Sequence, residues 1–166
     1  MRKDGYVVAV AGATGAVGEV MLQVLEERKF PVRRIKPLAS ERSAGKTVTF
    51  NGEAVPVERL TDRSFAGVDV ALFSAGAGRS KEFAPAAWAS GAVVVDNSSA
   101  FRMEPDVPLV VPEINPHAIA QYTNRGIVAN PNCTTIVTLM ALAPLHRYSR
   151  IRRVVASSYQ AVSGAG

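Results

Sequence analysis

Short, largely apolar segments alternate along the chain with segments in which apolar residues recur at helical spacing. The apolar segments are typical of strands buried in a parallel sheet, and they span residues 6–11, 35–39, 69–73, 92–95 and 126–129. Helical spacing is clearest at Val17, Val20, Met21, Val24 and Leu25. Further helices are expected over residues 80–90 and from residue 133 onward. The alternation predicts an α/β chain with a Rossmann-like, doubly wound and mostly parallel sheet.

Two segments interrupt this alternation. Thr47–Val55 predicts a small β-hairpin, because Asn51-Gly52 supplies the positive φ angles of a two-residue turn. Arg152–Gln160 has the composition of a further strand, and loop-type residues 163–166 follow it. Since a loop is a poor place to finish a domain, we expect the chain to be the front part of a longer protein.

Composition and charge narrow the class of protein. Of 166 residues, 48% are hydrophobic and 20% charged, which suits a soluble domain with a real core. The apolar runs fall far short of the ~20 residues that span a bilayer, and no signal segment is evident, so we expect a cytoplasmic protein. The net charge of +5 is scattered, so no nucleic-acid partner is expected. One cysteine cannot form an internal disulfide and is too few for a cysteine-based metal site, so no metal is predicted.

A glycine-rich loop lies between the first expected strand and the first expected helix. In this context Gly-x-x-Gly-x-x-Gly is a variant of the dinucleotide-binding motif. Gly12 permits the tight turn, Gly15 lets a pyrophosphate approach the backbone, and Gly18 lets helix and strand pack closely. Tight packing without a ligand would use the same glycines, but the context favours a cofactor. The candidate cofactor-binding residues of this loop are Gly12, Thr14, Gly15, Ala16, Val17 and Gly18.

Two further turns follow expected strands at the edge where this architecture binds ligands. After the second strand, Ser40 and Arg42 favour the 2′-phosphate of NADP, although the acidic Glu41 would suit the ribose of NAD. Ser43 of the same loop is a further candidate cofactor contact. An ordinary charged surface loop would have the same composition. In the later turn, small side chains would let a cofactor lie close to the backbone, at Ser74, Ala75 and Gly76.

The single cysteine, Cys133, follows an Asn-Pro-Asn turn and precedes a long apolar run. Such a turn is a helix-start signal, so Cys133 should lie at a helix N-terminus, where unpaired N–H groups and the helix dipole favour an anion. A thiolate is the form of cysteine that attacks carbon. A buried structural cysteine is the alternative, but the dinucleotide-type loop upstream favours a nucleophile. Arg102, in the polar loop after the strand at 92–95, could bind an anion or simply lie on the surface.

Together these segments closely resemble aspartate-β-semialdehyde dehydrogenase, in order and across nearly the whole chain. They are Gly12–Gly18, Ser40–Lys46, Asn97–Met103, Asn130–Thr135 and Ser158–Gly166. The resemblance implies reductive dephosphorylation of β-aspartyl phosphate to aspartate semialdehyde with NADPH, a step toward lysine, methionine, threonine and diaminopimelate. It also implies a homodimer in the full-length enzyme.

The resemblance assigns roles to individual residues. Cys133 matches the nucleophile that forms a thioester, Gln160 the active-site glutamine, and Arg102 the phosphate-binding arginine. Asn132 is a candidate substrate contact, and Gly164 a cofactor contact. Residues 1–132 then form the dinucleotide-binding domain, and residues 133–166 the first helix and strand of an α+β catalytic and dimerisation domain whose remainder is absent.

Two residues that the resemblance implies are missing from this pattern. The family's general acid/base histidine and the arginine for the substrate carboxylate have no match here, and His117 and His146 lie elsewhere and are expected to be structural. The chain alone is therefore expected to be inactive. Two alternatives stay open: an enzyme like N-acetyl-γ-glutamyl-phosphate reductase, in which a glycine commonly stands at the position of Asn132, and a non-catalytic NADP-binding module.

Overall fold

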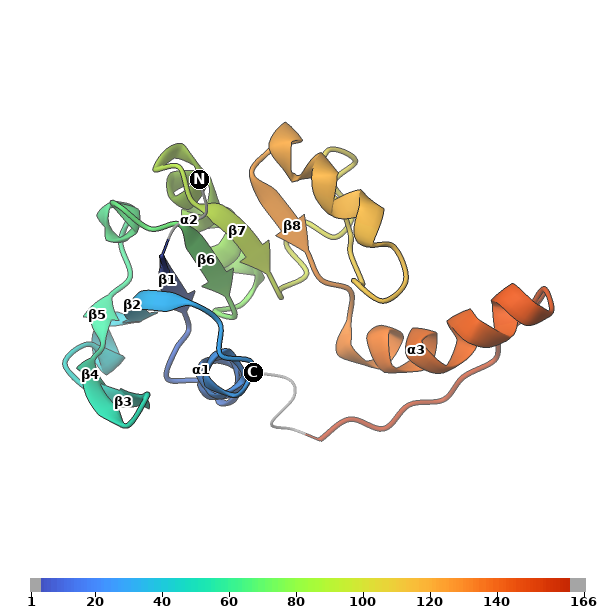
Figure 1. The fold of residues 1–166 in the computed structure, drawn as a ribbon, viewed down its shortest axis with the longest axis horizontal. Coiled ribbons are helices and arrows are strands. Elements are labelled where there is room, and N and C mark those ends of the chain that lie inside the picture. Colours follow the sequence, from blue (N-terminus) through green and yellow to red (C-terminus); the bar gives the residue numbers. More distant parts are fainter. Residues whose placement is uncertain (1–3, 162–166) are drawn as a thin grey trace.

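The computed structural model describes residues 4–161, and within them six parallel strands form one twisted sheet (Figure 1). The strand order is β5-β2-β1-β6-β7-β8. In chain order the strands are β1 (Tyr6–Ala11), β2 (Val32–Ala39), β5 (Glu58–Arg59), β6 (Val70–Phe73), β7 (Val93–Asp96) and β8 (Ile127–Ala129). The order reverses between β1 and β6, and this reversal is the feature that opens a ligand-binding crevice in doubly wound folds. The predicted architecture is confirmed.

Helices and a hairpin connect these strands. The α-helices are α1 (Ala16–Glu27), α2 (Ala77–Ala89) and α3 (Cys133–Tyr148), and the 3₁₀-helices are η1 (Glu41–Ser43), η2 (Asp62–Phe65) and η3 (Pro116–Asn124). Strands β3 (Thr47–Phe50) and β4 (Glu53–Pro56) pair antiparallel. Asn51 and Gly52 both have positive φ at the turn between them, as the predicted hairpin requires.

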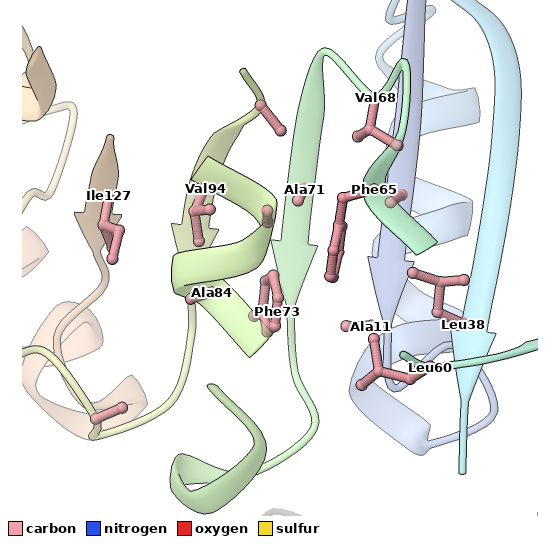
Figure 2. Packing of buried hydrophobic residues seen from close by; sticks show 14 of the residues in the cluster. Ala11, Leu38, Leu60, Phe65, Val68, Ala71, Phe73, Ala84, Val94 and Ile127 are labelled. Carbon is pink, nitrogen blue, oxygen red and sulfur yellow. The ribbon is translucent and has the colours of Figure 1, made fainter. Parts of the chain in front are cut away.

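One face of the sheet packs against α2 and η2. Figure 2 shows this core, in which Phe65 of η2 stacks on Phe73 of β6 with ring centroids 5.7 Å apart. Both rings are fully buried, together with Ala84 of α2 and Val94 of β7. The cluster continues to Ile127 of β8, so it ties the last strand to the first ones. This packing holds the ends of β6, β7 and β8 in place.

The other face of the sheet is covered over β1 and β2 by α1 and the β3–β4 hairpin. Val8 and Val10 of β1 point to this side and pack with Leu22 of α1 and Phe50 of the hairpin. Strand β1 is therefore buried on both faces, as predicted from its continuous apolar run. In β6 and β7 the burial alternates, because helices cover only one face there.

The expected strand at Arg152–Gln160 is not formed. Residues 151–161 have no regular secondary structure, and neither sheet of the described part of the chain includes them. A strand exists only through hydrogen bonds to a neighbouring strand, so composition alone could not form one here. The prediction of a strand in this chain is therefore wrong, whereas the preceding helix is present as α3.

Helix α3 lies apart from the sheet and has no buried residue (Figure 1). Its apolar side chains Val137 and Leu145 are 73% and 58% exposed, respectively. Within residues 4–161, no helix combines the length and the apolar character that crossing a membrane would require.

Candidate functional site

A cavity of about 680 Å³ opens at the C-terminal ends of β1, β2 and β6, where the strand order reverses. It is lined by the loops that follow these three strands and by the starts of α1 and α2. The lining residues are Gly12, Thr14, Gly15, Ala16, Val17, Ala39, Ser40, Arg42, Ser43, Lys46, Ser74, Ala75, Gly76 and Arg79. All the candidate cofactor residues predicted from sequence lie in this lining except Gly18 and Gly164. Gly164 falls outside the described residues.

The glycines of the first loop are required by close backbone approach. Gly12 has φ of 90°, and a Cβ there would collide with the carbonyl oxygen of Ser74. Gly18 is buried behind the loop, where a Cβ would collide with the carbonyl oxygen of Gly12. Gly18 therefore packs α1 onto the end of β1 instead of lining the cavity, which is the packing role that the motif predicts.

The N-terminus of α1 faces the cavity through Gly15 and Ala16. No side chain caps this terminus: Gly15 is the N-cap residue and makes no side-chain hydrogen bond. The first N–H groups of a helix have no intrahelical partner, and the dipole there favours negative charge. The open helix end, with glycines beside it, fits a pyrophosphate group.

Three cationic side chains border the cavity: Arg42, Lys46 and Arg79. Its lining, as far as the chain is described, includes no aspartate or glutamate. Glu41, which the sequence left as an argument for NAD, does not line the cavity; its Oε1 pairs with Nη1 of Arg59 at 3.2 Å. Sequence reasoning did not select Lys46 and Arg79. The signal for Arg79 was its place in the first turn of a helix that follows a small-residue loop.

Cys133 is the first residue of α3 and is exposed. Asn132 caps this helix: its Oδ1 accepts hydrogen bonds from the N–H groups of Thr134 and Thr135, at 3.0 and 3.4 Å. The cap satisfies two of the open N–H groups and aligns the helix with the turn. The structure therefore has Cys133 at a helix N-terminus, as the Asn-Pro-Asn turn predicts.

Arg102 is bound to the turn that carries the cysteine. Its Nε donates to the carbonyl oxygen of Asn130 at 2.8 Å, and its Nη2 donates to the carbonyl oxygen of Asn97 at 3.1 Å. A guanidinium has five N–H donors, so donors remain for an anion after these two bonds. The structure therefore brings Arg102 and the cysteine turn together.

The remaining candidates lie elsewhere. Gln160 is exposed and belongs to the segment that follows α3. This segment runs below α3 in the view of Figure 1. His117 is exposed at the start of η3, and Nδ1 of His146 accepts a hydrogen bond from the N–H of Ile151 at 3.2 Å. Among residues 4–161, no three histidine, cysteine, aspartate or glutamate side chains lie together as metal ligands would.

Comparison with known families decides the class of this site. Residues 7–122 match the model of the semialdehyde dehydrogenase NAD-binding domain. The chain belongs to the semialdehyde dehydrogenase family. The matched residues include the loops that line the cavity and the loop that carries Arg102, and Cys133 lies beyond them.

Curated and solved relatives of this chain agree with that family. It is 56% identical over 163 residues to the aspartate-semialdehyde dehydrogenase of Aquifex aeolicus, covering 98% of this chain and 48% of the relative. It is similar to Vibrio cholerae aspartate semialdehyde dehydrogenase II in complex with aspartate semialdehyde (TM-score 0.83, 55% identity, 86% of this chain and 47% of that one). The enzyme from Candida albicans with NADP matches at a TM-score of 0.71 and 26% identity, covering 89% of this chain and 48% of that one. The chain spans about half the length of the curated relatives it matches.

Proposed function

We propose that this chain is the N-terminal portion of an NADP-dependent aspartate-semialdehyde dehydrogenase, which converts β-aspartyl phosphate to aspartate semialdehyde and phosphate. The observation that carries the proposal is the cysteine turn: an exposed thiol at the capped start of α3, with Arg102 bound to the same turn. The sequence identity to aspartate-semialdehyde dehydrogenases supports the substrate.

In this reaction the thiolate of Cys133 attacks the acyl carbon of β-aspartyl phosphate. A carbon–sulfur bond forms, the carbon–oxygen bond to phosphate breaks, and inorganic phosphate leaves a thioester on Cys133. Arg102 binds the phosphate through its remaining N–H groups, and the dipole at the N-terminus of α3 stabilises negative charge on sulfur and on the acyl oxygen. After reduction of the acyl carbon, the carbon–sulfur bond breaks and the thiolate is restored.

The cavity at the reversal of strand order fits a dinucleotide, and NADPH held there would supply the hydride. The backbone at Gly12 and Gly15 and the open end of α1 would hold the pyrophosphate. Arg42, Lys46 and Ser43 would hold the 2′-phosphate, because guanidinium and ammonium groups bind phosphate strongly and the lining residues that the structure describes include no acidic group. We therefore propose NADP over NAD.

The division of the chain is part of the same proposal. Residues 1–132 serve as the cofactor domain, and residues 133–166 begin a catalytic and dimerisation domain that would supply the general acid/base, position Gln160 and form the homodimer. The exposed apolar side chains of α3 support this division, because they lack the cover that a finished domain gives to a helix.

The proposal is tested with the complete protein that carries this chain. Oxidation of aspartate semialdehyde, followed as NADPH absorbance, should require both NADP and phosphate. Cys133→Ser should lower kcat by a factor on the order of 10³ or more, because an alcohol in this position is not ionised. His117→Ala serves as the control and should leave kcat unchanged. Activity that persists in Cys133→Ser, or that does not need phosphate, would contradict the proposal.

A further inference from the structure

A buried carboxylate lies between the cavity and the cysteine turn. Asp96, the last residue of β7, is fully buried, and so is Ser80 of α2. The Ser80 hydroxyl donates to Oδ1 of Asp96 at 2.8 Å, and the Ser98 hydroxyl donates to Oδ2 at 2.8 Å. The Ser98 N–H adds a bond to Oδ1 at 3.2 Å. Neither carboxylate oxygen lacks a partner.

Stability alone does not explain this group. Removing a carboxylate from water is costly, and a well-packed apolar side chain in its place is often neutral or stabilising. Buried polar networks with every partner satisfied instead fix one arrangement of the segments that they join. The question is therefore which segments Asp96 joins.

Through Ser80, Asp96 holds the loop that borders the cofactor cavity. The N–H of Ser80 donates to the carbonyl oxygen of Gly76 at 3.0 Å, and Gly76 and Ala75 line the cavity. The position of Ser80 therefore sets the position of this turn and of the first turn of α2.

Through Ser98, Asp96 holds the loop that carries Arg102. The Ser98 hydroxyl also accepts a hydrogen bond from the N–H of Ala100 at 3.0 Å, which shapes this loop. Arg102 in turn donates to the carbonyl of Asn130. The N–H of Asn130 donates to the carbonyl oxygen of Asp96 at 2.9 Å, so the cysteine turn is bound from both sides.

We infer that Asp96 is a positioning residue that sets the cofactor loop at residues 74–76 and the phosphate-binding loop at residues 97–102 relative to each other. Ser80 carries its effect to the cofactor, and Ser98 carries it to Arg102 and the cysteine turn. The inference rests on the proposed function for the role of Arg102. The connection through Ser80 to the cofactor loop depends only on the cavity.

Two serine variants of the complete protein test separately the connection through Ser80 to the cofactor loop and the connection through Ser98 to Arg102. Ser80→Ala should raise the Kd for NADPH about tenfold and change the KM for phosphate less than twofold, because one charge-assisted bond to the cofactor loop is lost. Ser98→Ala should do the reverse, with about a tenfold rise in the KM for phosphate. Ser90→Ala is the matched control: its exposed hydroxyl caps the far end of α2, and both constants should stay unchanged.

A merely structural role would give a different result. Both serine variants would then lower the melting temperature and the active fraction while leaving Kd and KM unchanged, and that outcome would overturn the inference. If Ser98→Ala does not fold, Asp96→Asn keeps the side-chain shape and should raise both constants together; unchanged constants would overturn it. If the wild-type protein shows no phosphate-dependent activity, the proposed function fails. The Kd of Ser80→Ala for NADPH then still tests whether Asp96 positions the cofactor loop through Ser80.

Discussion

Individual side chains near Cys133 position the candidate site by forming hydrogen bonds with the backbone around it. Asn132 binds two N–H groups of α3, and Arg102 binds two carbonyl oxygens of the surrounding loops. Because these bonds are made within the protein, they define where the thiol and the remaining N–H donors of Arg102 point before any substrate arrives. Such preorganised donors stabilise developing charge without the cost of reorientation.

The cap of α3 gives a prediction at this scale. Asn132→Ala should weaken the start of the helix by about 1 kcal/mol, because two N–H groups lose their acceptor. Amide hydrogen exchange at Thr134 and Thr135 should then rise about fivefold, measured by NMR. Asn132→Ser retains an acceptor and is the control; equal exchange in both variants would show that the cap does not hold the helix start.

The cationic side chains around the cavity give a second prediction at the residue scale. Arg42→Ala should raise the Kd for NADP roughly tenfold or more, while the Kd for NAD changes little, because only NADP carries the 2′-phosphate that the guanidinium would bind. Fluorescence titration with both nucleotides measures the two constants. Arg63→Ala, an exposed arginine outside the cavity lining, serves as the control. A parallel rise in both Kd values would place the role of Arg42 elsewhere on the cofactor.

Among the elements, the contact between β1 and α1 positions the cofactor loop most directly. Gly18 brings the first turn of α1 against the carbonyl of Gly12, and Gly12 lies against Ser74 at the end of β6. The two glycines therefore bring together the ends of two neighbouring strands and the N-terminus of one helix. The cavity forms where these backbones meet.

Adding a methyl group at residue 18 tests how closely α1 must pack against the carbonyl of Gly12. Gly18→Ala should lower the free energy of unfolding by about 1–3 kcal/mol, because its Cβ would meet backbone atoms that cannot move without shifting the loop. Gly78→Ala, also helical but with open space around it, is the matched control and should be neutral or slightly stabilising. Urea unfolding measures both variants, and equal effects would mean that the contact adapts.

Across the whole molecule, the sequence predicts features that neighbouring residues determine, and it does not predict contacts between segments that are distant along the chain. The apolar run of β1, the glycine loop and the helix start at Cys133 are local, and each was predicted at its observed place. The pairing of Glu41 with Arg59 and the bond from Ser80 to Asp96 depend on segments that meet only in the fold. Arg152–Gln160 has strand composition, but strand formation requires a partner that composition does not specify.

Helix α3 gives the prediction at this largest scale. Its side chains Val137, Leu145 and Tyr148 are 73%, 58% and 94% exposed, and an apolar surface of this kind drives association. We expect residues 1–166 expressed alone to self-associate, and Val137→Glu with Leu145→Glu to lower the apparent mass in light scattering toward that of one chain. The double variant Thr123→Glu with Asn124→Glu adds the same charge on η3 and is the control. If both double variants reduce association equally, net charge and not the face of α3 is responsible.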